Sequence, residues 1–162
     1  MQNFDAQPRR GSGKGRDVAR VTRSEVDLDL ARRMAAAALQ AAANEQALVS
    51  VAVVDGGGHL ICFERMNGAE IAGPVLAVDK AYTAVAHRAG THELTSLVGP
   101  GGPLAGMHSA NQGHFICFAG GLPLWSEGRV VAGVGVSGGT AEQDLAAATA
   151  AKELFVEAEA QA

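Results

Sequence analysis

Residues 107–114 hold the densest group of side chains that could do chemistry. Within these eight residues the chain has two imidazoles, a thioether and two amides, beside a stretch rich in glycine and proline. An imidazole can bind a metal ion or a haem iron, and it can transfer protons near neutral pH. Five residues separate His108 from His114, and this spacing matches no common zinc motif. His108 and His114 are therefore candidate ligands or a candidate acid/base pair.

The second half of the chain adds groups that could assist a histidine. Glu127 lies in a predicted hairpin turn, and it or Asp55 could orient an imidazole as a carboxylate partner. Trp125 is the single tryptophan and could stack on a planar ligand, although a partly buried tryptophan on a strand is the simpler interpretation. Backbone amides at the start of the last predicted helix could hold an anion, and they belong to Gly138, Gly139 and Thr140.

A glycine pattern at residues 133–138 resembles a dinucleotide fingerprint. It fits G-x-G-x-x-G, follows a predicted strand and precedes a predicted helix. Only 24 residues follow Gly138, too few for the helix, the second strand and the acidic ribose contact of a dinucleotide fold. We interpret the pattern as a strand-to-helix turn with tight backbone packing.

Apolar periodicity and turn residues predict the elements that position these groups. Hairpin-joined strands imply an antiparallel sheet with helices packed on it, so the predicted fold class is α+β. The predicted helices are residues 24–45 after a capping box at Thr22 and Glu25, a helix that starts near Pro74 and is capped by Gly90, a short turn at 92–97, and residues 140–159 after a second capping box. The predicted strands are residues 48–54, 59–65, 114–118, 121–125 and 129–136.

Length and composition predict one domain that assembles with copies of itself. The chain has 162 residues, of which 32 are alanine and 21 are glycine, so small side chains must form much of the core. Alanine-rich helices have narrow apolar stripes, and subunit contacts often complete their burial. We expect a homo-oligomer built from a single domain at residues 22–162, after a disordered basic leader at residues 1–21.

Charge and hydropathy exclude several classes of partner. The net charge is −4, and the first 20 residues carry five basic and two acidic groups, which leaves −7 on the rest. An acidic folded part without a basic face argues against nucleic acid. The absence of an apolar run of membrane length argues against a membrane partner, and we expect a cytoplasmic protein. Cys62 and Cys117 each lie in an apolar run and are predicted to be buried thiols.

Several ordered motifs together resemble the GlcG/HbpS family of haem-binding-type domains, which includes the C-terminal domain of PduO. The resemblance covers roughly residues 24–156, and it is carried by residues 49–60 (VSVAVVDGGGHL), 64–66 (ERM), 79–84 (DKAYTA), 120–124 (GGLPL) and 133–144 (GVGVSGGTAEQD). It implies a five-stranded antiparallel sheet flanked by helices, a profilin-like architecture, and assemblies from dimers to octamers. It also implies haem- or corrinoid-linked binding. Residues 106–114 are richer in histidine than the run usual in this family.

Three functional hypotheses follow from these residues and this resemblance. The first is a small-molecule binding domain that holds haem or a related planar ligand between the 99–114 loop, the sheet near Trp125 and a neighbouring subunit. His108 or His114 would then be the axial ligand, and Lys80 or Arg88 would pair with the propionates. The second is an isomerase, lyase or hydrolase for a small metabolite, with His108 or His114 as general base and no cofactor, or with His108, His114 and a carboxylate as ligands of a divalent metal. The third is an accessory protein with a vestigial pocket.

Overall fold

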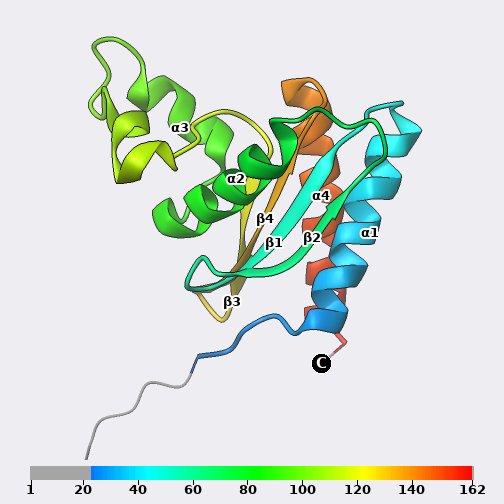
Figure 1. The fold of residues 1–162 in the computed structure, drawn as a ribbon. Helices are drawn as coiled ribbons and strands as arrows, with labels where there is room; N and C mark the ends of the chain where they lie inside the picture. The colour runs from blue at the N-terminus through cyan, green and yellow to red at the C-terminus, as the bar shows by residue number, and fades with distance from the viewer. Residues whose placement is uncertain (1–22, 162) are drawn as a thin grey trace, which may run out of the picture.

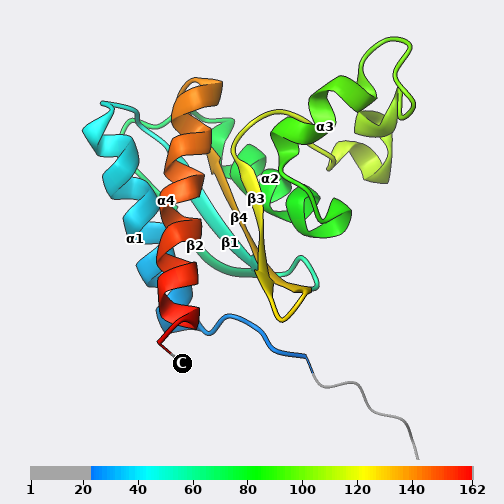
Figure 2. The same cartoon turned by 180° about the vertical axis from the view of Figure 1, so that it is seen from behind.

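The helices and strands follow the predicted order around an α+β core. The computed structural model describes residues 23–161, so the predicted leader lies outside the described residues. In Figures 1 and 2, α1 and α4 lie side by side on one face of the sheet, and α2 lies on the other face. The elements are α1 (Leu28–Asn44), β1 (Ser50–Asp55), β2 (Leu60–Arg65), α2 (Gly73–His87), α3 (Thr91–Val98), the 3-10 turns η1 (Met107–Ser109) and η2 (Asn111–Gly113), β3 (Gly121–Ser126), β4 (Arg129–Ser137) and α4 (Ala141–Glu159).

The sheet has four strands in the described part of the chain, where five were predicted. The strand order is β2-β1-β4-β3, and every neighbouring pair is antiparallel. Residues 114–118, the expected fifth strand, bond to helices instead. Ile116 N donates to Thr83 Oγ1 of α2 at 2.9 Å, and Thr95 Oγ1 of α3 donates to Cys117 O at 2.8 Å. Because threonine hydroxyls satisfy these backbone groups, the segment has no need of a strand partner.

Helix α2 packs directly on the backbone of β4. A Cβ atom at Gly135 would lie 2.0 Å from Ala77 O, and one at Gly133 would lie 2.8 Å from Ala81 O. Only glycine allows so close an approach of helix to strand. The glycine pattern at residues 133–138 is therefore a packing device, as the sequence interpretation predicted.

The opposite face of the sheet carries the larger apolar core. Small side chains from α1 and α4 meet there, so that the two helices pack closely against each other and against β1 and β4. Three larger buried residues fill the remaining space, namely Met34, Leu124 and Phe155. This core and α2 together hold the sheet between two layers of helix.

Helix boundaries differ from the prediction where a different residue provides the cap. Helix α1 begins at Leu28 because Asp27 Oδ1 accepts a hydrogen bond from Leu30 N at 2.8 Å; Thr22 of the expected capping box lies outside the described residues. Helix α2 ends at His87 and is capped by Arg88 in a left-handed conformation, and Gly90 instead precedes α3. The second capping box is confirmed, with Thr140 and Gln143 at the start of α4. None of the helices described is long and apolar enough to cross a membrane.

Both cysteines are buried free thiols, as predicted. Burial raises the pKa of the Cys62 thiol, and the nearby Glu64 carboxylate adds to this shift. Burial also raises the pKa of the Cys117 thiol. Because the thiolate is the reactive form, neither cysteine is suited to act as a nucleophile at neutral pH.

Candidate functional site

His114 is held against helix α2 by Asp79. The His114 Nδ1 atom lies 2.9 Å from Asp79 Oδ1. Thr83, one turn further along α2, fixes the same segment through its hydroxyl, which lies 2.7 Å from Asp79 O and 3.2 Å from His114 O and accepts from Ile116 N. Both the ring and the backbone of His114 are thereby positioned by a helix rather than by the preceding loop.

This contact determines which ring nitrogen of His114 is free. An ionised carboxylate only accepts hydrogen bonds, so in the neutral imidazole the proton lies on Nδ1 and Nε2 keeps its lone pair. The His114 side chain is 52% exposed, whereas that of Asp79 is only 13% exposed. A carboxylate behind the ring is the usual arrangement for metal-binding histidines, because it fixes the tautomer and raises the basicity of the free nitrogen. His114 is thus presented as a ligand.

Aromatic rings lie next to His114, on the following residue and on helix α2. Phe115 stacks on Tyr82 with ring centroids 6.1 Å apart, and the His87 ring meets Phe115 edge-on at 4.6 Å. Among the described residues, buried His87 Nε2 has no hydrogen-bond partner. Gly58 has a φ of 85° and lies against Tyr82, where a Cβ atom would come within 2.6 Å of Cδ2. These rings form an apolar surface next to the imidazole.

His108 lies in a different setting. It is exposed on the 3-10 turn η1, and η2 separates it from His114. Two residues of this connection, Asn111 and Gln112, have positive φ angles of 50° and 60°. Residues 23–161 contain no group of three or more His, Cys, Asp or Glu side chains that could hold a metal ion. The metal-bound version of the enzyme hypothesis therefore finds no ligand set in this part of the chain.

Lys80, a predicted partner for propionates, has a structural role instead. Its side chain is completely buried, and Nζ donates to Asp144 Oδ2 at 2.7 Å and to Val136 O at 2.8 Å. The ammonium also lies 4.8 Å from the centroid of the Phe118 ring. Burial lowers the pKa of Lys80, and the hydrogen bond and charge of Asp144 oppose that shift. The pair connects α2 to α4, and its burial keeps the ammonium away from a ligand.

The amides predicted to hold an anion are also engaged within the chain. Gly139 N donates to Asp144 Oδ1, and Thr140 N donates to Gln143 Oε1, both at 2.9 Å. Gly138 has a φ of 141°, and a Cβ atom there would lie 2.4 Å from Leu48 O. Residues 138–140 thus form a tightly packed turn and helix cap.

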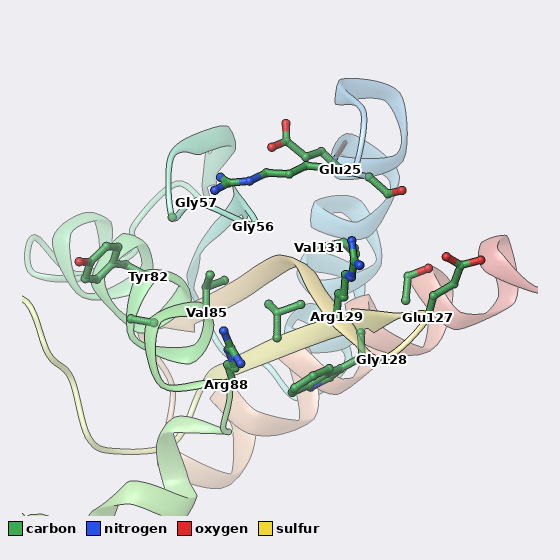
Figure 3. A pocket seen from close by; sticks show the side chains of 17 residues that line it. Glu25, Gly56, Gly57, Tyr82, Val85, Arg88, Glu127, Gly128, Arg129 and Val131 are labelled. Atoms are coloured by element: carbon green, nitrogen blue, oxygen red, sulfur yellow. The ribbon is translucent and has the colours of Figure 1, made fainter. Parts of the chain in front are cut away.

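A separate pocket, which we name the hairpin pocket, opens between the two hairpin turns and the C-terminal end of α2 (Figure 3). Its volume is about 610 Å³. Of the predicted site residues, Arg88, Trp125 and Glu127 line it, whereas no residue of the 99–114 loop does. The other charged residues in its lining are Arg23, Glu25 and Arg129.

The carboxylate that orients His114 is therefore neither of those predicted. Glu127 lines the hairpin pocket, and Asp55 Oδ1 accepts from Gly57 N and His59 N, both at 2.8 Å. Partial burial works to raise the pKa of Asp55, but the backbone hydrogen bonds from His59 and Gly57 and the His59 ring outweigh it and lower the pKa. Asp79 was predicted to lie on a helix, but no local pattern in the sequence indicates its contact with a histidine 35 residues away.

Comparison with known families confirms the resemblance found in the sequence. A family model described as haem degrading protein HbpS-like matches residues 26–153. The chain therefore belongs to the HbpS-like family.

Relatives of this chain include free-standing and fused forms. A 15.0 kDa protein from the dhaT-dhaS intergenic region of Citrobacter freundii is 40% identical over 144 residues, which cover 89% of this chain and 98% of that protein. The corrinoid adenosyltransferase PduO of Citrobacter freundii is 44% identical over 109 residues, 67% of this chain but only 32% of PduO. The crystal structure of a PduOC:heme complex is similar with a TM-score of 0.78 and 37% identity, covering 81% of this chain and 95% of that one.

Proposed function

We propose that this chain is a haem-binding domain in which His114 is the axial ligand. Membership of the HbpS-like family and the similarity to the PduOC:heme complex support haem as the ligand. The observation that carries the choice of residue is the 2.9 Å contact between His114 Nδ1 and Asp79 Oδ1. In the neutral imidazole this contact leaves the lone pair on Nε2, which is what an iron ligand requires, and half of the His114 side chain is exposed.

The surrounding residues fit a flat apolar ligand at this nitrogen. Asp79 sets the rotation of the imidazole, and Thr83 holds the backbone on which His114 is mounted. The rings of Phe115 and Tyr82 offer an apolar surface beside it. Bound haem would supply the iron and its redox chemistry, and the chain supplies the ligand, its orientation and part of the apolar wall.

A neighbouring subunit would complete the wall that a single chain leaves open. Half of the His114 side chain is exposed, and two apolar side chains near it in the sequence, Leu104 and Phe118, are 41% and 46% exposed. A copy of the chain packed on this surface would cover them and exclude water from the iron. This supports a homo-oligomer with the ligand at or near the subunit contact.

A visible-light titration with haemin tests this function. The wild-type protein should give a saturating Soret shift at one site per chain, and His114→Ala should lose it. Asp79→Asn should weaken binding by about 10- to 100-fold, because it removes the carboxylate behind the ligand. His108→Ala and, as a matched control, His92→Ala on α3 should bind as the wild type does. Equal haemin affinity in the wild type and His114→Ala would refute the assignment.

A further inference from the structure

Two arginines enter the hairpin pocket without a carboxylate partner. Arg88 comes from the end of α2 and Arg129 from the start of β4. In Figure 3 both side chains reach into the space between the hairpin turns, and the Glu127 carboxylate lies on the opposite side of the view from Arg88. The ion pairs within residues 23–161 are His59–Asp55, Lys80–Asp144 and His114–Asp79. Neither guanidinium is therefore neutralised by the part of the chain that the structure describes.

Backbone conformation at the edge of this pocket is unusual for the residues found there. Arg88 has a φ of 54° and Glu127 a φ of 48°, in the left-handed region that favours glycine. A side chain in this region raises the backbone energy above that of glycine. A glycine at this helix cap would avoid that energy. The presence of an arginine there therefore supports a functional role for its side chain.

The remaining walls of the pocket offer flat and apolar surfaces. Trp125 is 43% exposed and Tyr82 is half-buried. Val85 and Val130 also line the pocket. The volume of about 610 Å³ lies within the range of small-molecule sites, roughly 300 to 1,000 Å³. A planar guanidinium matches a carboxylate through two parallel hydrogen bonds, and an indole ring stacks on another ring.

The charges that line the pocket set the charge of its ligand. Three arginines and two glutamates give a net charge of +1, counted over Arg23, Arg88, Arg129, Glu25 and Glu127. One carboxylate neutralises this charge, and the apolar walls then accept the rest of the molecule. None of the lining residues is His114 or Asp79, although Tyr82 lines this pocket and also stacks on Phe115 beside His114.

We propose that the hairpin pocket is a second binding site, for a small aromatic monocarboxylate, whose carboxylate is bound by Arg88 and Arg129 and whose ring lies against Trp125. The site does not depend on haem. It gives the domain a means of binding an organic acid through residues other than His114.

Trp125 allows a direct test because it is the only tryptophan in the chain. Benzoate is the probe, and uncharged benzamide is the control ligand of the same shape. Benzoate should change the tryptophan emission of the full chain in a saturable way, and benzamide should not. Arg88→Gln and Arg129→Gln should each weaken benzoate binding by about 10-fold or more, the usual effect of losing a hydrogen bond to a charged group. Arg32→Gln, on the exposed face of α1 outside this pocket, should bind benzoate as the wild type does.

The outcomes separate this site from the haem site. His114→Ala should keep its benzoate affinity even where it loses the Soret shift. Calorimetry on the same variants measures the benzoate affinity without relying on tryptophan emission, which the substitutions themselves can change. The proposal is overturned by an equal response to benzamide, by unchanged affinity in both arginine variants, or by inorganic phosphate competing as strongly as benzoate.

Discussion

The buried ion pair between Lys80 and Asp144 makes a quantitative prediction about stability. Replacing Lys80 with methionine keeps most of the side-chain volume but removes the ammonium. The Asp144 carboxylate, also buried, then keeps only its hydrogen bond from Gly139 N, and Val136 O loses its contact with Nζ at 2.8 Å. Breaking a buried pair from one side costs about 3–5 kcal/mol because a buried charge is left without a partner. We expect Lys80→Met to lower the free energy of unfolding by that amount.

Urea unfolding of Lys80→Met, Asp144→Leu, their double variant and the control Lys152→Met measures this effect. Lys152→Met, on the exposed face of α4, should change the free energy of unfolding by less than about 0.5 kcal/mol. The double variant Lys80→Met/Asp144→Leu should recover much of the loss, because it removes both charges together. The reasoning fails if Lys80→Met loses less than about 1 kcal/mol, or if the double variant is as unstable as the sum of the two single variants.

Two further predictions concern the packing of α2 and the first hairpin. Gly135→Ala should destabilise the protein by about 1–3 kcal/mol or more in thermal unfolding, because the new Cβ would lie 2.0 Å from Ala77 O. The control Gly99→Ala, with 3.9 Å to the nearest atom, should change the stability by less than about 0.5 kcal/mol. Similar melting temperatures of the two variants would contradict this packing. Asp55→Asn should lose about 1–2 kcal/mol at neutral pH, because the amide accepts the turn hydrogen bonds less strongly than the carboxylate does. The folded-state pKa of Asp55 lies below its ordinary value of 3.8, so its contribution to stability is present above about pH 4 and is lost as the pH falls through the folded-state pKa. The stability of Asp55→Asn should accordingly fall less steeply with acid, and equal slopes below about pH 4 would exclude this role.

Local signals were sufficient to predict most of the fold. The Thr140 capping box, the glycine turn after Asp55 and the packing glycines of β4 each act within a few residues or one strand, and the structure bears them out. The prediction of a strand at residues 114–118 was wrong, because an apolar run favours a strand whatever its hydrogen-bond partners are. Its hydrogen bonds go to Thr83 and Thr95, which no local pattern connects to it.

The site was predicted less completely because it depends on contacts between distant segments. Composition singled out His114, but the carboxylate that orients it comes from α2. Lys80 has the residue type of a surface cation, and only its placement between α2 and α4 shows it to be buried. The hairpin pocket is formed by two turns and a helix end. Arg129 was not predicted as a site residue, because its neighbours in the pocket lie far away along the chain.

Asp79 and Lys80 are consecutive residues, and this adjacency links the interior of the protein to its candidate ligand site. Successive residues of an α-helix point about 100° apart, so the rotation that places Lys80 beside Asp144 also places Asp79 beside His114. At Gly133 and Gly135, α2 lies in close contact with the β4 backbone. Substitutions on this helix therefore change folding and ligand orientation together. An engineer who wishes to change ligand preference alone has more freedom in residues 99–118, of which only Cys117 is buried.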